Sequence, residues 1–423
     1  MLIEFSVANF RSLRNRQTFS LTKAKGSELA ETNTFTASAV NDFELVRSTA
    51  IYGPNAGGKS NFLRAMQAMK KIVLESATIL QRGDKLPVTP FRLNKTTAIA
   101  PSEFEITFIV NQVRYQYGFS ATEHRIHEEW LLAYPKGRPQ RWLDRVWTEE
   151  SNTYDWELGN NLVGEKQLWQ KSTRDNALFL STAVQLNSEQ LQPIYDWFKN
   201  TLRMANLGGW SPGFSASLCE RKEKKLVMDF LNAADMDIED ILIEKKPFDT
   251  HALPSDIPEP LKTRIANDFR DKEVLNIKTV HKSIDGKPVI FDLNEESDGT
   301  QKLFSFAGPW IDALANGYVL FIDELHDNLH PRLVQFLVQL FHNSETNPNN
   351  AQLVFTTHET SILNQEVFRR DQIWFCEKDE DQATTVYPLT DFSPRKGREN
   401  LELSYLSGRY GALPYIRPFR KTG

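Results

Sequence analysis

Hydrophobic and polar residues alternate along much of the first third of the chain, as they do in β-strands that have one buried face. Two of these segments flank Asn111-Gln112 and predict a β-hairpin there. Residues 23–44 are polar and mixed, and we expect them to form a loop or flap. The predicted strands of this region are residues 2–7, 17–21, 103–110, 113–119, 126–134 and 141–147.

The apolar pattern changes to a helical period near residue 165. Residues 189–202 carry apolar side chains at helical spacing, and a further helix is expected to begin at residue 220. The charged run that opens this helix, residues 220–225, is typical of a solvated helix face. Residues 206–217 are rich in Gly and Ser and therefore predict a loop.

Three prolines between His251 and Pro260 indicate a linker, and strands are expected to return at residues 275–281 and 288–293. The fold class predicted from these patterns is α/β, with a mixed sheet core, an antiparallel N-terminal lobe and a helical insertion. The expected division of the chain is residues 1–159 for the N-terminal lobe, 160–275 for the insertion and 276–423 for the C-terminal lobe.

Composition excludes several classes of protein. The 423 residues suffice for two to three domains, and 40% hydrophobic with 25% charged residues is ordinary for a soluble globular protein. A net charge of −5 argues against a chain that coats nucleic acid over its whole surface. Two cysteines, Cys219 and Cys376, imply no disulfide framework and favour a reducing cytoplasm. No apolar run approaches the ~20 residues of a membrane span, and the N-terminus lacks the pattern of a signal peptide.

The segment Gly53-Pro-Asn-Ala-Gly-Gly-Lys-Ser60 fits the phosphate-binding pattern G-x-x-x-x-G-K-[ST], between an apolar strand and a helical pattern. Small residues let backbone N–H groups surround a phosphate, and the N-terminus of the following helix favours an anion. Lys59 adds positive charge near the β- and γ-phosphates, and the Ser60 hydroxyl is placed to bind Mg²⁺. The predicted nucleotide ligands of this loop are Gly53, Asn55, Ala56, Gly57, Gly58, Lys59, Ser60 and Asn61.

Residues 318–324 form an apolar run that ends in two acids, as expected of a central strand buried on both faces. At the end of such a strand, Asp323 could hold Mg²⁺, directly or through water. Glu324 could act as the general base toward the attacking water. A capped strand end is the alternative interpretation, and the P-loop upstream favours a Walker B segment instead.

A second apolar strand, residues 352–358, ends in His358 and follows the acidic strand after one predicted helix that begins at Pro331. One intervening helix places both strand ends at the same edge of a parallel sheet, where the sites of α/β proteins form. His358 is therefore a candidate sensor of the γ-phosphate, and a structural histidine is the alternative.

The turn Glu296-Ser-Asp-Gly-Thr-Gln-Lys302 precedes a helical segment, residues 303–315. Ser297 and Gly299 could bind a phosphate through a hydroxyl and N–H groups at the start of this helix. An ordinary N-cap by Ser297 or Asp298 is the alternative.

These motifs together resemble an ABC-type ATPase of the SMC/Rad50/RecF class: a P-loop, a Ser-x-Gly-x-Gln turn, an Asp-Glu strand and a strand-end histidine, in this order. The segment Asn9-Phe-Arg-Ser-Leu13 is similar to the start of that class. More narrowly, the chain resembles the AAA-15/AAA-21 group of stand-alone bacterial ATPases, and its ending is similar to the RloA and abortive-infection type. The chain also resembles the ATPase of PARIS defence. The segments that carry the narrower resemblance are residues 296–303, 323–331 and 405–415, and the likeness covers roughly residues 1–135 and 276–423.

The resemblance implies a P-loop NTPase fold of the ABC/SMC-head type, with ATP and Mg²⁺ as ligands. ATP would lie between two subunits, so that Ser297 and Gly299 of one subunit cap the γ-phosphate held by Lys59 of another. It also implies that Arg11 lies near the nucleotide. The sequence contains no long heptad run, which argues against a DNA-tethering coiled coil.

We therefore predict a cytoplasmic ATPase that forms a homodimer or higher homo-oligomer around ATP and controls a separate nuclease-like or toxin-like effector, encoded nearby, in bacterial anti-phage defence. A RecF/Rad50-like ATPase that acts on DNA in repair, and an ATP-binding scaffold with little turnover, are the alternatives. The basic tail after residue 393 interleaves Tyr405, Tyr410 and Tyr415 with arginines and lysines. It could bind single-stranded nucleic acid, dock a partner or pack on its own domain. No membrane partner is expected.

Overall fold

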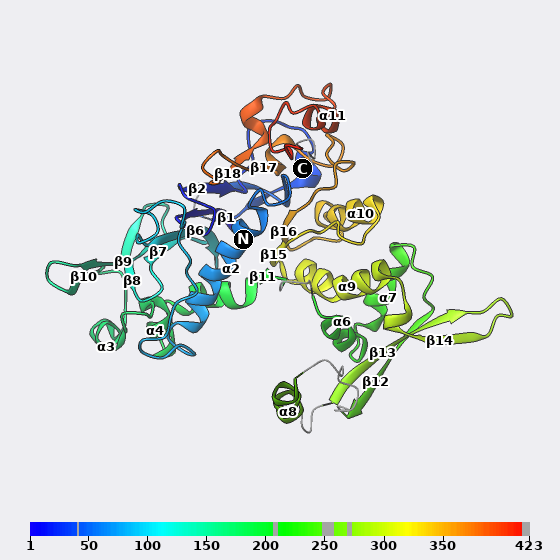
Figure 1. Ribbon diagram of the computed structural model, residues 1–423, viewed down its shortest axis with the longest axis horizontal. Coiled ribbons are helices and arrows are strands. Elements are labelled where there is room, and N and C mark those ends of the chain that lie inside the picture. Colours follow the sequence, from blue (N-terminus) through cyan, green and yellow to red (C-terminus); the bar gives the residue numbers. More distant parts are fainter. Residues whose placement is uncertain (40–41, 206–209, 248–257, 269–272, 417–423) are drawn as a thin grey trace, which may run out of the picture. The chain divides into compact units, whose positions relative to one another are not determined.

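The computed structural model describes residues 1–39, 42–205, 210–247, 258–268 and 273–416 (Figure 1). The chain forms two compact units. The first unit comprises Met1–Leu207, Ala313–Asp327 and Val334–Gly423, and the second comprises Gly208–Asp312 and Asn328–Leu333. The segments of each unit are far apart in sequence, so each unit is assembled from non-local pieces of the chain.

The first unit contains a seven-stranded antiparallel sheet in the order β10-β9-β8-β7-β6-β1-β2. The predicted hairpin at Asn111-Gln112 is confirmed, because β6 and β7 pair across it from Val110 and Val113 outward. Strand β10 was not predicted, although Tyr154 and Trp156 alternate with more exposed residues along it. The strands are β1 (Leu2–Ala8), β2 (Gln17–Ser20), β6 (Ser102–Val110), β7 (Val113–Ala121), β8 (Ile126–Tyr134), β9 (Gln140–Thr148) and β10 (Thr153–Leu158).

A second, six-stranded sheet of the same unit has the order β11-β15-β16-β5-β17-β18. All neighbouring pairs are parallel except β17 with β18. Every residue of β5, β15 and β16 is buried, which explains their continuous apolar runs. The strands are β5 (Ser48–Tyr52), β11 (Leu202–Met204), β15 (Val319–Ile322), β16 (Gln352–Thr356), β17 (Ile373–Lys378) and β18 (Thr384–Pro388).

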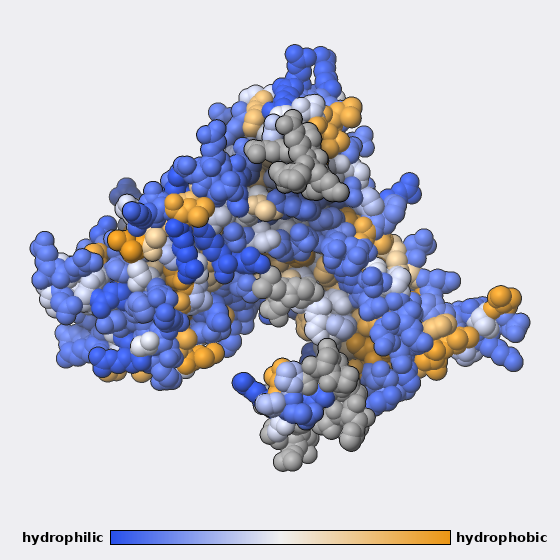
Figure 2. All heavy atoms as spheres, viewed as in Figure 1, coloured by the Kyte–Doolittle hydropathy of each residue, from blue (hydrophilic) through white to orange (hydrophobic). Residues whose placement is uncertain are grey.

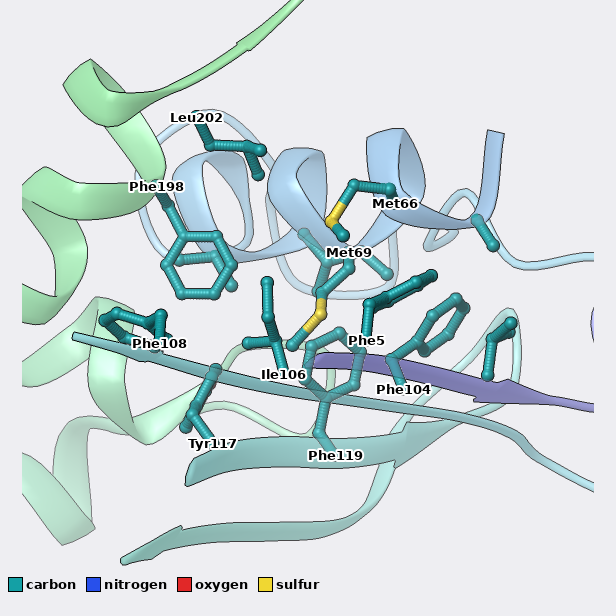
Figure 3. Packing of buried hydrophobic residues seen from close by; sticks show 14 of the residues in the cluster. Phe5, Met66, Met69, Phe104, Ile106, Phe108, Tyr117, Phe119, Phe198 and Leu202 are labelled. Carbon is teal, nitrogen blue, oxygen red and sulfur yellow. The ribbon is translucent and has the colours of Figure 1, made fainter. Parts of the chain in front are cut away.

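Helix α2 (Lys59–Glu75) packs against the antiparallel sheet through its apolar face. Figure 3 shows Met66 and Met69 of α2 facing Phe5 and Ile106, which come from β1 and β6. The ring of Phe5 also lies edge-on to that of Phe62 in the first turns of α2, with centroids 5.5 Å apart. This core fixes the helix that begins at the P-loop.

Residues 23–44 were expected to form a loop or flap, and this prediction was wrong in part. The structure has a short helix, α1 (Ala30–Asn33), and a strand pair, β3 (Thr34–Ala37) with β4 (Phe43–Val46). Phe35 pairs with Leu45, and both side chains are buried with Ile3 and Ile109. Two buried apolar residues therefore stabilise this strand pair, and the polar residues around them led to the prediction of a loop.

The remaining helices of the first unit lie wholly within it, except that the first residues of α10 belong to the second unit. The helix predicted at residues 189–202 is divided into α5 and a π-helical turn, Trp197–Thr201, in which Trp197 and Phe198 are buried. The predicted helix after the acidic strand is confirmed as α10. The helices are α3 (Lys166–Ser172), α4 (Phe179–Gln185), α5 (Gln192–Asp196), α10 (Pro331–His342) and α11 (Leu401–Leu406), with 3₁₀ turns at Arg370–Gln372 and Leu389–Phe392.

The second unit combines helices with a three-stranded antiparallel sheet in the order β12-β13-β14. Part of the predicted loop at residues 206–217 is the helix α6, which Ser211 caps by accepting the Gly213 N–H. Strand β12 was not predicted, and residues 251–257 of the predicted linker lie outside the described residues. The elements are α6 (Pro212–Cys219), α7 (Lys224–Ala233), β12 (Asp240–Pro247), α8 (Glu259–Asp268), β13 (Glu273–Lys282), β14 (Pro288–Asp292), a 3₁₀ turn (Leu293–Glu295) and α9 (Asp298–Asn316).

The α/β fold class with an antiparallel N-terminal lobe and a mixed sheet is confirmed. Hydrophilic side chains predominate on the face of the molecule shown in Figure 2. Within the described ranges, none of the helices has both the length and the apolar character needed to span a bilayer.

Candidate nucleotide-binding site

The P-loop, residues 53–60, connects β5 to α2, as its strand–loop–helix context predicts. A side chain on Gly53 would collide with the carbonyl oxygen of Cys376 in β17, and one on Gly58 would collide with Thr384 in β18. Both glycines also have positive φ, 154° and 109°. Strands β17 and β18 therefore require small residues at these positions, in addition to any requirement from a phosphate.

The loop borders a cavity of about 260 Å³ in the first unit. All the predicted loop ligands from Asn55 to Asn61 line it, and Glu324 from the acidic strand end joins them. Two further cations, Arg64 and Lys378, line the same cavity and were not predicted. The cavity thus combines backbone N–H groups, cations and one carboxylate.

Lys59 is the buried cation of the site, with 5% of its surface exposed. Its Nζ atom donates to the carbonyl oxygens of Gly53, at 2.7 Å, and Pro54, at 3.1 Å. Burial lowers the pKa of Lys59, while the nearby Glu324 and Asp323 carboxylates act in the opposite direction. An anionic phosphate would replace the weak carbonyl acceptors with a full negative charge.

The two acids follow directly after β15. The Thr356 hydroxyl, at the end of β16, donates to Asp323 Oδ1 at 2.6 Å and accepts the Glu324 N–H at 2.8 Å. Glu324 has a positive φ of 53°, a strained conformation for a residue with a side chain, and its carboxylate lies 3.8 Å from His358 Nε2. Thr356 therefore fixes the backbone turn that directs Glu324 toward the cavity and the histidine.

His358 lies at the end of the neighbouring strand, two residues beyond β16. Its ring nitrogens are both 3.4 Å from Lys59 Nζ. Burial lowers the pKa of His358, the Lys59 charge lowers it further, and Glu324 opposes this shift. A neutral imidazole at pH 7 can donate one hydrogen bond to a phosphate oxygen without competing with Lys59 for charge.

Residues 48–364 match the family described as AAA domain, "putative AbiEii toxin, Type IV TA system". The match covers more than half of the chain, including the P-loop, both acids and His358. The chain belongs to this family of ATPases. No curated protein matches it.

Among solved structures, this AAA-21 family member is similar to SMC head domains. The SMC head domain from Thermotoga maritima has 13% identity and a TM-score of 0.38, and the match covers 92% of this chain and 98% of that one. An SmcHead bound to the C-winged helix domain of ScpA has 12% identity and a TM-score of 0.37, with 92% and 97% covered. The Smc head domain of Pyrococcus furiosus, with an extended coiled coil and bound to the C-terminal domain of ScpA, has 12% identity and a TM-score of 0.39, with 92% and 96% covered.

The predicted signature turn of the AAA-21 chain lies in the second unit. The Ser297 hydroxyl accepts the Thr300 N–H at 3.1 Å, as an N-cap of α9 does. A Cβ on Gly299 would lie 3.0 Å from the Asn328 carbonyl oxygen, so this position is crowded by backbone. Ser297 and Gly299 are thus placed at the start of α9, while the other predicted ligands and both acids belong to the first unit.

Arg11 lies in the turn after β1, and this turn contacts the P-loop helix. Asn61 donates from Nδ2 to the Ser12 Oγ at 2.8 Å, which places the residue after Arg11 against the first turn of α2. The Arg11 backbone has a positive φ of 52° and donates its N–H to the Thr89 carbonyl oxygen at 2.8 Å. The side chain of Arg11 is exposed.

The site residues that the sequence did not reveal are those without a motif. Thr356 precedes Thr357-His358, and a hydroxyl residue at the end of an apolar strand was a usable signal. Arg64 follows Ser60 by one helical turn, which places it on the same face of α2. Lys378 offered no local signal, because only the pairing of β17 with β5 brings it to the cavity.

Proposed function

We propose that this AAA-21 protein binds ATP with Mg²⁺ in the P-loop cavity and hydrolyses it. One observation carries the proposal: the P-loop, Glu324 and His358 follow three neighbouring parallel strands, β5, β15 and β16, and meet at the carboxyl edge of one sheet. Such an edge is where open α/β sheets bind their ligands.

Each side chain has a distinct role in the proposed reaction. Lys59 binds the β- and γ-phosphates, and Glu324 orients and deprotonates the attacking water. His358 donates a hydrogen bond to the γ-phosphate. Ser60 and Asp323 would hold Mg²⁺, because a hydroxyl and a carboxylate supply the oxygen ligands that this ion prefers, and the bound ion would offset phosphate charge.

The proposed site is completed by a second copy of the chain. Ser297 and Gly299 stand at the N-terminus of the 19-residue helix α9, which favours an anion. A turn of this kind from one subunit would cap the γ-phosphate bound by Lys59 of another, so that ATP holds a homodimer or a larger homo-oligomer together.

We further propose that this assembly regulates a separate effector in bacterial anti-phage defence. The family description, which names a toxin of a toxin–antitoxin system, supports a second component. The resemblance of residues 405–415 to abortive-infection ATPases supports the same role. A nuclease-like or toxin-like protein encoded nearby is the expected partner.

Two measurements test the proposal. Purified protein should hydrolyse ATP in the presence of Mg²⁺ and increase in mass by native mass spectrometry when ATP is added, whereas Lys59→Ala should do neither. Absence of both effects in the wild type would contradict ATPase function. Affinity purification from native expression should recover the neighbouring gene product; turnover that DNA stimulates, without such a partner, would favour the repair alternative instead.

A further inference from the structure

The P-loop cavity is bordered by more positive charge than its motif supplies. Arg64 of α2 and Lys378 at the end of β17 line the cavity beside Lys59, whereas Glu324 is the one acidic residue in the described lining. Among the described residues, no carboxylate forms an ion pair with Arg64 or Lys378. By contrast, Arg14 pairs with Asp379, at 3.1 Å, and Asp381, at 2.7 Å, in the turn after Lys378.

A hydrogen-bond network holds Arg64 in place. Arg64 donates to Asn61 Oδ1 at 3.3 Å, and Asn61 donates to Ser12 at 2.8 Å. The Ser12 hydroxyl is 2.8 Å from that of Thr384, which donates to the Gly57 carbonyl oxygen at 3.1 Å. Three segments, the turn after β1, helix α2 and the β17–β18 hairpin, are therefore joined around the loop.

Like charges are costly to bring together unless an anion offsets them. Partial burial of its guanidinium and then the nearby Arg64 charge lower the pKa of Arg11, although the residue as a whole is exposed. Lys59 and Mg²⁺ together carry three positive charges, and fully ionised ATP carries four negative ones. The Glu324 carboxylate adds a fifth negative charge to the cavity. Arg64 and Lys378 bring the positive charges from three to five, so the two totals are equal when ATP is bound.

We propose that Arg64 and Lys378 are further nucleotide ligands, which bind phosphate oxygens of the α- and β-phosphates. Arg64 is held by Asn61, on the helix turn that follows the P-loop, whereas His358 and Glu324 mark the end where the γ-phosphate reacts. The two cations therefore contribute to ATP and ADP binding alike. This inference rests on the proposed ATPase function and extends its set of ligands.

The test compares dissociation constants for ATP and ADP, with Mg²⁺, in wild type, Arg64→Ala and Lys378→Ala. Each alanine variant should bind both nucleotides with about tenfold lower affinity, which is the effect of losing one charge-assisted hydrogen bond. Arg64→Lys should recover part of the loss, because it keeps the charge. Lys71→Ala is the matched control, since Lys71 lies on the same helix and pairs with Glu75 at 3.8 Å.

The outcomes separate this inference from the proposed function. If wild type binds ATP and Lys59→Ala does not, while Arg64→Ala and Lys378→Ala bind like the control, only the inference is overturned. If the variants lost affinity for ATP but not for ADP, the inference would also be contradicted, because that result would place the two cations at the γ-phosphate. If wild type binds neither nucleotide, both the inference and the proposed ATPase function are overturned.

Unchanged nucleotide affinity with weaker binding of a DNA oligonucleotide would assign the cations to nucleic acid and overturn the inference. Thermal unfolding of each variant identifies any that fail to fold, for which Arg64→Lys and Arg64→Met replace alanine.

Discussion

The Nζ atom of Lys59 lies 3.4 Å from both ring nitrogens of His358, so the cation of the P-loop lies next to the imidazole that follows β16. The two groups come from segments almost 300 positions apart. Their proximity means that the protonation of His358 depends on Lys59, because a neighbouring positive charge disfavours the imidazolium ion.

Lys59→Ala should therefore have two effects. ATP affinity should fall by at least ~10²-fold, because the phosphates lose a buried, charge-assisted hydrogen-bond donor. The pKa of His358 should rise, because burial would remain as a cause of its lowered pKa but the Lys59 charge would be gone. Nucleotide titration and NMR titration of the imidazole measure these effects. Undiminished ATP affinity would reject the site assignment.

Glu324→Gln should separate binding from chemistry. The amide keeps the size of the side chain but cannot accept a proton from water, so hydrolysis should slow by at least ~10²-fold. ATP should remain bound, and oligomers should accumulate with it. Single-turnover hydrolysis and native mass spectrometry measure these outcomes, with Glu359→Gln as a control on a nearby loop carboxylate. Hydrolysis at the wild-type rate would show that Glu324 is only a strand-end carboxylate.

The parts of the site that the sequence predicted are those encoded locally. The P-loop, the Asp323-Glu324 pair and His358 each follow a continuous apolar strand, and the pattern of such strands is visible in a short window. The same holds for the antiparallel strands around Asn111-Gln112.

The residues and strands that were not predicted from the sequence depend on pairing between distant segments. Ser12 and Thr384 are 372 positions apart, yet their hydroxyls share a hydrogen bond, and Thr384 also contacts Gly57 of the P-loop. Lys378 reaches the cavity only because β17 lies beside β5. The strands β3 and β4 were missed because two buried residues, Phe35 and Leu45, carry their stability within a mostly polar segment.

His342 provides a prediction about pH. Its ring is buried and lies 2.7 Å from the Oγ atom of Ser48 in β5, and burial lowers its pKa to about 3, with Arg47 contributing. The unfolded chain binds this proton near pH 6.5, so stability is full above that pH and is lost as the pH falls toward 3. At pH 5 the loss should be about 2 kcal/mol. The free energy of unfolding should fall less between pH 7 and pH 5 in His342→Gln than in wild type. Urea denaturation at both pH values measures this fall. An equal difference in the two proteins would show that other groups carry the acid sensitivity.

The last prediction tests whether the site is shared between subunits. In the proposed assembly, Lys59 of one chain and Ser297 of another act on the same ATP. Lys59→Ala and Ser297→Arg should each be inactive alone, the second because a bulky cation replaces the small residue at the start of α9. Mixed heterodimers should contain one intact site, with Lys59 from the Ser297→Arg chain and Ser297 from the Lys59→Ala chain. ATPase activity should therefore recover to as much as half that of wild type per heterodimer.

Native mass spectrometry of the mixture shows whether heterodimers form, and Lys71→Ala mixed with Ser297→Arg gives the activity expected when one parent is fully functional. A site that is complete within one chain predicts no recovery, because each chain of the heterodimer still lacks one of its own groups. Background activity in confirmed heterodimers would therefore contradict independent shared sites. Recovery would require that Ser297 acts on a nucleotide bound by the Lys59 of another chain, since no other pairing in the mixture contains both residues intact.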